Sequence, residues 1–462
     1  MVLNGSVFYA SSKSGFILLL QYGNKCPATE AFKKGKIQLS PLKKCAILLH
    51  NMRRVFPYVL IFLRFSIIAL LLIAGCGGGS GSMHEEPLPE AKWTVMVYMA
   101  GDSDISEAAF HNINDMKEIG STSDVNVIVQ VEFNTEISPL LPKNTLRGRI
   151  VEDHNNKEIG STLYDLGNLD MTDPSTLTNF ISWASTQYPA EHYALVLWSH
   201  GLGWKGPSKG MIKDVTSAGD NYIMPLPYLA HAIQDSGVKL DIVDFDACLM
   251  GMYEVAYELK GLSDYITFSE ALFPIYGNPY TSIIGELISR PDIKGEELAH
   301  IIISACMDYY KDSNYSFTKS AIRSSELEKV HIGVNELANI LINNMASEGE
   351  HIRTAIGKTE EYYSYIYRDL GDFLDQLKMQ TTNEQLLSSI TALDSMLNDL
   401  VIDDQSYCPD TDNPVARSHG MAIYLPAPGL NISRDLLKYS TLSCNKSDSV
   451  TWADFVTRLS AD

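Results

Sequence analysis

A cysteine and a histidine of this 462-residue chain each follow an apolar segment, and together they could supply a nucleophile and a proton-transfer group. His200 follows the segment YALVLWS, and Cys248 follows LDIVDFDA. Apolar segments of this length are typical of buried strands in a parallel sheet. Because the carboxyl ends of parallel strands lie at one edge of a sheet, we expect the imidazole and the thiol to lie close together. The pattern therefore predicts nucleophilic catalysis by Cys248, with His200 as general base or acid.

The residues around this pair indicate how such a reaction would be assisted. A helix is predicted over residues 249–259, directly after Cys248, and a helix N-terminus lowers the pKa of a thiol. The backbone N–H groups of Gly201 and Cys248 are candidate oxyanion donors, because glycine lets the chain approach closely. A single cysteine or histidine at a strand end is more often structural. The prediction therefore depends on both residues lying at the same edge.

Alternating strands and helices are expected to position these groups. Helical patterns separate apolar strands that are predicted over residues 93–100, 125–133, 193–198, 240–245 and 265–269. This alternation predicts right-handed crossovers and an α/β/α sandwich with a mostly parallel central sheet. One of the helices is predicted to begin at Asp173-Pro174, with Asp173 as its N-cap.

Beyond about residue 291 the pattern changes to long helices. These are predicted over residues 295–311, 324–346 and 383–402, with one late strand over 421–425. The chain is therefore predicted to contain a catalytic domain over residues 91–290 and a mainly helical C-terminal region over residues 291–462.

The start of the chain differs from the rest in charge and hydropathy. Residues 1–75 carry ten basic side chains and one acidic side chain, whereas the other 26 basic and 55 acidic side chains give the remainder a net charge of −29. A basic region after Met52, an apolar run and the ending Ile-Ala-Gly-Cys predict a bacterial lipoprotein signal peptide over residues 52–75. Cys76 would then be the acylated first mature residue. A membrane-spanning anchor is the alternative, but Arg64 interrupts the apolar run.

This interpretation divides the front of the chain. Residues 1–51 precede a complete export signal, so we interpret them as a misassigned upstream segment, with an extended signal region as the alternative. Residues 76–90 contain the run GGGSGS and are predicted to be a flexible tether. The protein is thus expected to be an exported bacterial lipoprotein, anchored to a lipid bilayer through Cys76 on the periplasmic or cell-surface side.

The composition argues against several classes of protein. The net charge of −20 argues against a nucleic-acid partner, since phosphate binding needs a basic face. Seven cysteines are too few for a disulfide scaffold, although a bridge between Cys408 and Cys444 stays open. Cys306 lies in an apolar helical pattern and is expected in the core. The sequence contains no HExxH motif, CxxC pair or Walker A loop and therefore requires no zinc or nucleotide cofactor.

Four sequence blocks carry a resemblance to a known family. The segments WTVMVYMAGDSDI, ALVLWSHGLGW, DIVDFDACLMGMYEVAYEL and SEALFPIYGNPY resemble the clostripain family of cysteine peptidases. The resemblance implies a fold of the caspase, gingipain and legumain type, with His200 as the catalytic base or acid and Cys248 as the nucleophile. It covers residues 91–290 well and the C-terminal region loosely.

The resemblance also implies cleavage after Arg or Lys, so that the substrates would be proteins or peptides with basic residues. Asp246 matches the family's Asp-Ala-Cys motif and is the leading candidate to bind the basic side chain, because a carboxylate pairs with a guanidinium or ammonium group. The alternative for Asp246 is a cap on the following helix. Ser269 and Glu270, which end the fifth strand, are weaker candidates for the substrate pocket.

Self-processing and calcium are two further implications of the resemblance. The glycine-rich loop after His200 is a flexible, cleavable setting, and Lys209 and Lys213 are its candidate self-cleavage sites. Calcium is suggested by the resemblance alone, since no spacing matches an EF-hand loop. Solvated acids are therefore the simpler interpretation of the available oxygen ligands, which belong to Asp102, Asp104, Asp214 and Asp220.

Two other motifs provide competing sites. Ser208 lies in a G-x-S-x-G sequence, but the strand before it ends eight residues earlier and no helix is predicted to start at Gly210, as a nucleophile elbow requires. His419 belongs to a second Ser-His-Gly sequence, and it precedes its predicted strand instead of following it. The sequence therefore favours a cysteine endopeptidase. The alternatives are an inactive peptide-binding lipoprotein of the same fold and a serine esterase that uses Ser208.

Overall fold

The computed structural model describes residues 7–12, 15–20, 87–155, 157–159, 162–205, 210–219, 223–363, 365–409, 415–447 and 449–461. The chain divides into two compact units, Met1–His84 and Glu85–Asp462. In the first unit, β1 (Val7–Ser12) and β2 (Gly15–Leu20) form an antiparallel pair. The predicted signal peptide, Cys76 and most of the predicted tether lie outside the described residues. Within the described part of the chain, no helix is long and apolar enough to cross a membrane.

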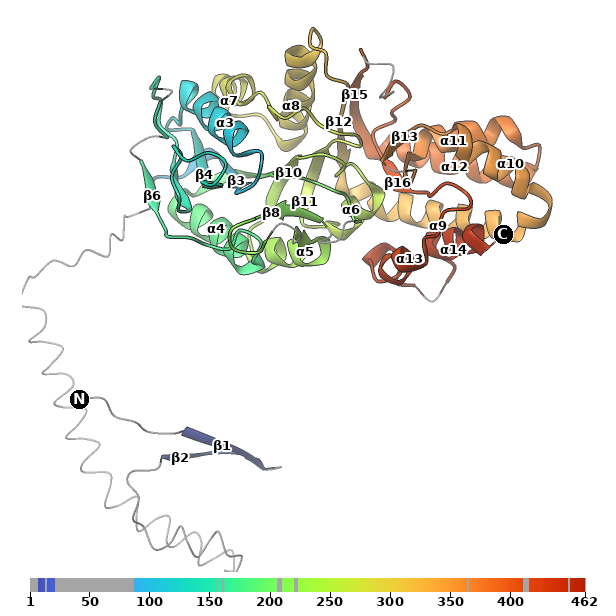
Figure 1. Ribbon diagram of the computed structural model, residues 1–462, viewed down its shortest axis with the longest axis horizontal. Coiled ribbons are helices and arrows are strands. Elements are labelled where there is room, and N and C mark those ends of the chain that lie inside the picture. Colours follow the sequence, from blue (N-terminus) through green and yellow to red (C-terminus); the bar gives the residue numbers. More distant parts are fainter. Residues whose placement is uncertain are drawn as a thin grey trace, which may run out of the picture. The chain divides into compact units, whose positions relative to one another are not determined.

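A nine-stranded sheet forms the centre of the second unit (Figure 1). Its five central strands, in the order β11-β10-β7-β3-β4, are parallel to their neighbours. The bounds of these strands are β3 Ala91–Gly101, β4 Val125–Phe133, β7 Ala190–Trp198, β10 Leu240–Asp246 and β11 Ser263–Phe268. Antiparallel strands flank them, with β5 (Leu146–Arg149) and β6 (Leu163–Asp165) beyond β4, and β12 (Phe317–Arg323) and β15 (Val401–Tyr407) beyond β11.

Helices cover both faces of this sheet (Figure 1). One layer contains α3 (Ser106–Ile119), α7 (Tyr280–Ser289) and α8 (Gly295–Tyr310), and the other contains α4 (Pro174–Gln187), α5 (Leu226–Asp235) and α6 (Tyr253–Glu258). Alternate residues of β3 contribute to the two cores, Met96 and Tyr98 to one and Val95 and Val97 to the other. This explains why the strand is a continuous apolar run. The predicted α/β/α fold class is confirmed.

The sequence after residue 290 contributes to the same sheet. Besides β12 and β15, it forms the small sheet of β13 (Glu361–Tyr363), β14 (Tyr367–Asp369) and β16 (Ala422–Tyr424). The prediction of a single late strand is therefore wrong. The two additional strands of the large sheet were not predicted because their sequences are polar, FTKSAIR for β12 and VIDDQSY for β15. Such sequences do not show the apolar pattern of a buried strand.

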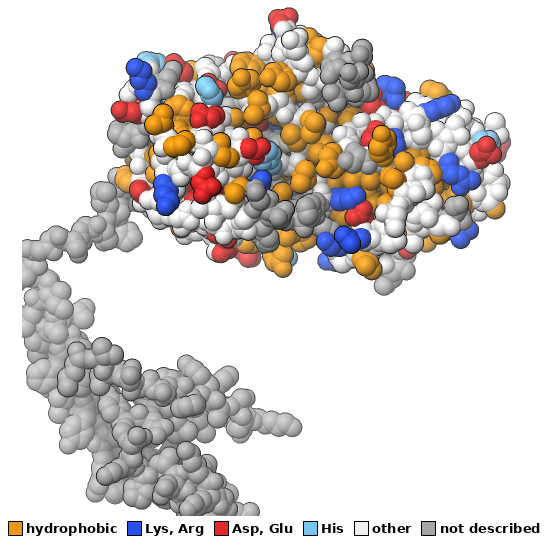
Figure 2. All heavy atoms as spheres, viewed as in Figure 1, with side chains coloured by type: hydrophobic (Ala, Val, Ile, Leu, Met, Phe, Trp, Pro, Cys, Tyr) orange, Lys and Arg blue, Asp and Glu red, His pale blue; other side chains and the backbone are white. Residues whose placement is uncertain are grey.

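The remaining helices of the C-terminal part are α9 (Leu327–Asn343), α10 (Met345–Lys358), α11 (Leu370–Gln380), α12 (Glu384–Leu400), α13 (Ser433–Tyr439) and α14 (Trp452–Ala461). Short elements complete the fold, namely η1 (Ser324–Glu326), η2 (Ser443–Asn445) and the antiparallel pair β8 (Gly210–Lys213) and β9 (Ile223–Pro225). Helix α9 packs against α6, and buried side chains of all six helices belong to the same large core that covers one face of the sheet. On the face shown in Figure 2, Lys and Arg side chains lie mostly over this helical end.

Candidate active site

The structure brings His200 and Cys248 into one pocket. Strands β7 and β10 are adjacent and parallel, and Trp198 is paired with Asp246. Since His200 and Cys248 each follow these paired residues by two positions, both lie at the carboxyl edge of the sheet. They line a pocket of about 240 Å³ together with Asp104, Ile105, Trp198, Ser199, Asp246, Ala247, Phe273, Pro274, Ile275 and Gly277.

The thiol of Cys248 is held by the backbone of Phe273. Its sulfur accepts a hydrogen bond from the Phe273 N–H at 3.2 Å and donates to the Phe273 carbonyl oxygen at 3.7 Å. Burial raises the pKa of this thiol above its ordinary value. Within the described residues, no hydrogen bond joins the thiol to His200. A base is therefore needed before the sulfur can act as a nucleophile.

The predicted helix directly after Cys248 is wrong, because α6 begins only at Tyr253. Leu249 adopts a left-handed conformation, with φ of 59°. Its N–H donates to the Ala271 carbonyl oxygen, and the Gly251 N–H donates to that of Ser269. These bonds hold the segment against the chain after β11 instead of in a helical turn. The expected lowering of the thiol pKa by a helix N-terminus is absent.

The imidazole of His200 is paired with a carboxylate. Its Nε2 lies 2.7 Å from Asp104 Oδ1, and the two side chains are 34% and 68% exposed. Burial acts to raise the pKa of Asp104, but the hydrogen bond and charge of His200 lower it below its usual value. Sequence reasoning had considered Asp104 only as a cation ligand. Asp104 follows β3, which is parallel to β7 and adjacent to it. This position at the carboxyl edge is the sequence signal that could have placed Asp104 beside His200.

Gly201 is required by a close contact with the Cys248 backbone. A Cβ atom at this position would lie 2.2 Å from the Cys248 carbonyl oxygen, which no side chain tolerates without movement. Gly201 also forms a β-bridge with Met211 of β8. The proposed oxyanion donors, the N–H groups of Gly201 and Cys248, are thus on segments that touch each other.

Asp246 lines the same pocket as a buried carboxylate. Its Oδ2 accepts hydrogen bonds from the Asn278 N–H at 3.0 Å and the Tyr280 hydroxyl at 2.8 Å. It therefore holds the segment at the start of α7 and does not cap a helix directly after Cys248. Burial raises the pKa of Asp246 to about 6, with the charge of Lys319 acting in the opposite direction.

Lys319 is a buried cation beneath this pocket. Its Nζ donates to Asp244 Oδ1 at 2.8 Å and to the Phe245 carbonyl oxygen at 3.1 Å, and its side chain has no exposed surface. Asp244 also accepts hydrogen bonds from Thr267 and Asn278. Lys319 therefore compensates one of the two carboxylates below the site. Lys319 was not predictable as part of the site, because it lies in β12, whose polar sequence does not indicate a buried strand.

Ser269 and Glu270 are fully buried and lie outside the pocket that Cys248 lines. The Ser269 hydroxyl bonds to the Ala271 carbonyl oxygen and to the Thr318 hydroxyl. Glu270 Oε2 accepts hydrogen bonds from the Ser418 hydroxyl and the Gly420 N–H. In this structure the hydrogen bonds of the two residues fix the chain after β11, and neither side chain has exposed surface that a substrate could contact.

The processing candidates lie in the loop after His200. Lys213 ends β8, is partly buried, and donates its N–H to the Ser199 hydroxyl at 3.1 Å. Lys209 lies outside the described residues, as does Ser208. The residue that follows them, Gly210, begins a strand and not a helix, so this part of the nucleophile-elbow pattern is missing.

The other candidate histidine and cysteines do not line the pocket of Cys248. His419 Nδ1 bonds to Asp369 Oδ1 at 2.9 Å, and this bond raises the pKa of His419 to about 9. Cys306 is buried in the core, as expected. Cys444 is a buried free thiol, so the structure does not contain the disulfide between Cys408 and Cys444.

Three acidic residues form a buried cluster close to the His200 loop. Asp102 and Asp214, which sequence reasoning considered as calcium ligands, lie with Glu132, which it missed. Burial raises the pKa of Glu132 to about 9 and that of Asp214 to about 6. The fourth acid considered there, Asp220, lies outside the described residues.

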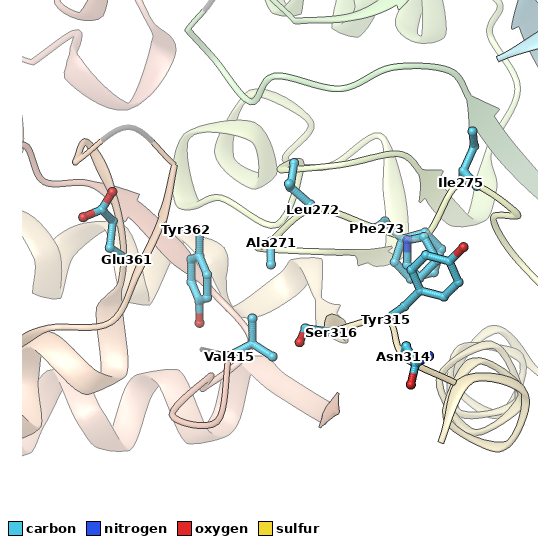
Figure 3. A pocket seen from close by; sticks show the side chains of 11 residues that line it. Ala271, Leu272, Phe273, Ile275, Asn314, Tyr315, Ser316, Glu361, Tyr362 and Val415 are labelled. Atoms are coloured by element: carbon cyan, nitrogen blue, oxygen red, sulfur yellow. The ribbon is translucent and has the colours of Figure 1, made fainter. Parts of the chain in front are cut away.

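A second pocket adjoins the first. It has a volume of about 290 Å³ and shares Phe273, Pro274 and Ile275 with the pocket of Cys248. Figure 3 shows that its wall also contains Tyr315, and Tyr362 from β13. Leu272 and Ile275 are 55% and 50% exposed. The two pockets therefore form a continuous surface with apolar side chains beside the thiol.

A mostly parallel sheet between helical layers, with a cysteine and a histidine in one pocket at its carboxyl edge, is the arrangement of a caspase-like cysteine peptidase. The chain belongs to the clostripain family, whose model matches residues 97–458. It is therefore a cysteine-type peptidase, a hydrolase that acts on proteins or peptides.

Individual relatives agree with this assignment. The chain is 22% identical to clostripain from Hathewaya histolytica over 396 residues, which are 72% of this chain and 74% of that protein. A secreted C11 cysteine protease from Bacteroides thetaiotaomicron, solved with an irreversible peptide inhibitor, superposes with a TM-score of 0.59 at 23% identity, covering 79% of this chain and all of that one. An inactive zymogen C11 protease from Parabacteroides distasonis gives a TM-score of 0.58 at 23% identity, covering 77% of this chain and 98% of that one. The structural likenesses show the fold.

Proposed function

We propose that Cys248 and His200 are the catalytic dyad of an endopeptidase that cleaves after Arg or Lys. The observation that carries this proposal is the shared pocket at the carboxyl edge of β7 and β10, with a carboxylate, Asp246, in its lining. A carboxylate in a partly closed pocket favours a guanidinium or ammonium side chain. The adjoining apolar surface at Leu272 and Ile275 offers contacts to neighbouring residues of an extended peptide.

The reaction begins with the thiol in its protonated state, because burial raises the pKa of Cys248. His200 accepts the thiol proton as the sulfur attacks the scissile carbonyl carbon, and Asp104 stabilises the resulting imidazolium. The N–H groups of Gly201 and Cys248 stabilise the oxyanion. His200 then donates its proton to the leaving amine, which yields a thioacyl-enzyme. Water, activated by His200, hydrolyses this intermediate and restores the thiol.

An active-site label tests the dyad. An arginyl chloromethylketone should alkylate Cys248 in the wild type, as identified by mass spectrometry of the labelled peptide, and should block hydrolysis of fluorogenic Arg and Lys peptides. Cys248→Ala should lose both the label and the activity, whereas Cys408→Ser, a change at a partly buried cysteine outside the pocket, should retain both. Labelling of Cys248 without hydrolysis of any peptide in a positional scan would instead favour an inactive peptide-binding protein.

Self-processing and membrane anchoring are further parts of the proposal. Cleavage after Lys209 or Lys213 should convert wild type into two fragments, and Cys248→Ala should remain intact; an active enzyme that stays a single chain would contradict this. The composition of residues 52–76 supports export and acylation, and the similar protease from B. thetaiotaomicron is described as secreted. Metabolic labelling with an alkyne fatty acid should mark the wild type and not Cys76→Ser.

A further inference from the structure

Residues 269–273, the thiol loop, hold the proposed nucleophile from one side. The Phe273 N–H donates to the Cys248 sulfur, and the thiol donates to the Phe273 carbonyl oxygen. The carbonyl oxygens of Ser269 and Ala271 accept hydrogen bonds from the segment after Cys248. A displacement of about 1 Å at a reacting group can cost about 10²-fold in rate. Whatever fixes the thiol loop therefore also controls the reactivity of the sulfur.

Glu270 ties the thiol loop to the C-terminal part of the chain. Its side chain has no exposed surface. Its Oε2 accepts hydrogen bonds from the Ser418 hydroxyl and from the Gly420 N–H, the latter at 3.2 Å. These donors lie 148 and 150 residues later in the sequence. The carboxyl group thus joins the loop that holds the thiol to the segment before β16.

Glu270 has no positive charge to stabilise it in the ionised form. Among the described residues, no basic side chain forms an ion pair with it. Its second oxygen, Oε1, is buried, and no N–H or O–H group of the described residues donates to it. A buried carboxylate without a cation is costly and usually takes up a proton instead. Burial raises the pKa of Glu270 well above its ordinary value, and the negative charges of Asp369 and Asp404 and a hydrogen bond with Asp369 act in the same direction.

Asp369 lies beside Glu270 on the same three residues, 418–420. The His419 N–H donates to Asp369 Oδ2 at 2.8 Å, between the two residues that donate to Glu270. The imidazole of His419 bonds to Asp369 Oδ1 at 2.9 Å. The charge of His419 therefore compensates Asp369 and leaves Glu270 without compensation. A proton on Glu270 would remove the repulsion between the two carboxyl groups and supply a donor for Asp369.

We propose that Glu270 is an uncharged carboxylic acid that donates a hydrogen bond to Asp369 and thereby positions the thiol loop. Glu270 is a positioning residue, because it does not line the pocket of Cys248 and acts on the sulfur through Phe273. This inference rests on the proposed role of Cys248 as the nucleophile. It adds that the segment over residues 91–290 depends on the C-terminal region for the position of its thiol.

Two substitutions of Glu270 separate a neutral acid from a charged one. Glu270→Gln keeps the shape, an acceptor oxygen and a donor for Asp369, so it should retain the wild-type kcat and the wild-type rate of Cys248 alkylation by iodoacetamide. Glu270→Asp keeps the acid but withdraws it by one methylene. It should lower kcat by about 10²-fold with little change in KM, and should slow alkylation by about tenfold.

The matched control is Glu254→Asp, the same change at a second fully buried carboxyl group. Its Oε1 accepts from the Tyr424 N–H and the Tyr439 hydroxyl, and it lies outside the thiol loop. Circular dichroism measures the folded fraction of each variant, so that rates are compared per folded molecule. Glu254→Asp should keep the wild-type alkylation rate even where it lowers the unfolding midpoint.

Infrared difference spectroscopy reports the proton directly. In a Cys248→Ala background at neutral pH, the C=O band of a protonated carboxyl group should be present with Glu270 and lost with Glu270→Gln. Neutral acids elsewhere in the chain occur in both proteins, so their bands cancel in the difference. This measurement needs neither hydrolysis nor the Glu270→Asp variant.

Three results would overturn the proposal. A Glu270→Gln protein that reacts as slowly as Glu270→Asp, or that does not fold, would show that this position needs a negative charge. Wild-type alkylation and kcat in Glu270→Asp would remove the positioning role, and an unchanged infrared band would remove the proton. If Glu270→Asp does not fold, the Glu270→Gln rates and the infrared band decide the question. A wild type whose Cys248 is alkylated but which cleaves no peptide contradicts the proposed dyad alone, because alkylation and the infrared band still test Glu270.

Discussion

Replacing Lys319 by methionine tests whether the buried cation holds the floor of the active site together. The Nζ atom lies 2.8 Å from Asp244 Oδ1 in a fully buried setting. At that separation the attraction is about 6 kcal/mol for an effective dielectric constant of about 20. Part of this is offset by the cost of desolvating the two charges. Removing one partner of a buried pair typically costs about 3–5 kcal/mol, since the other charge stays buried and unpaired.

We therefore expect Lys319→Met to lower the free energy of unfolding by about 3–5 kcal/mol. Urea unfolding, followed by tryptophan fluorescence in a Cys248→Ala background, measures this loss without self-digestion. The matched control is Lys239→Met, which breaks a pair with Asp264 whose side chains are 81% and 49% exposed, and this change should have little effect. Combining Lys319→Met with Asp244→Asn should recover a large part of the loss. If Lys319→Met costs no more than Lys239→Met, the reasoning about charge compensation is refuted.

Three further predictions concern the pocket and its surroundings. Because burial raises the pKa of Asp246 to about 6, its carboxylate is ionised above that pH and protonated below it. The kcat/KM for an Arg substrate should therefore fall as the pH drops through about 6, and a profile for Asp246→Asn with the same inflection would contradict this. Gly201→Ala should reduce kcat/KM by about 10²-fold or more, since its Cβ meets the Cys248 carbonyl oxygen, whereas Gly357→Ala, with open space at its Cβ, should be neutral. The hydrogen bond to Asp369 raises the pKa of His419 to about 9 in the folded protein. The stability that the protonated imidazole contributes is therefore complete below its unfolded pKa of about 6.5 and is lost as the pH rises through 9. The difference in unfolding midpoint between wild type and His419→Asn should shrink over that window, and a difference that does not vary with pH would rule out this account.

The parts of the fold that follow from local burial were predictable from the sequence. β4 coincides with its predicted bounds, Val125–Phe133, because every residue is buried and most of the run is apolar. The N-cap at Asp173 is confirmed, since its side chain accepts from the Ser175 N–H. Local chemistry alone determines both features.

The parts that depend on distant partners were not predictable. Lys319 of β12 can be buried because it forms an ion pair with Asp244, which lies 75 residues earlier in the chain. The sequence of β12 alone does not indicate this partner. The segment after Cys248 is drawn away from a helix by bonds to Ala271 and Ser269. Glu132 was overlooked because it lies inside an apolar strand, far along the chain from Asp214.

The second pocket has a consequence for anyone who wishes to redesign this peptidase. Its wall is built by distant stretches of the chain, namely residues 271–275, residues 314–316, and the later residues Glu361, Tyr362 and Val415. A shortened protein ending near residue 290 would retain the thiol and the imidazole but lose that later wall. Exchanging the β13 hairpin between relatives is therefore a route to new side-chain preferences that leaves the bond-breaking groups untouched.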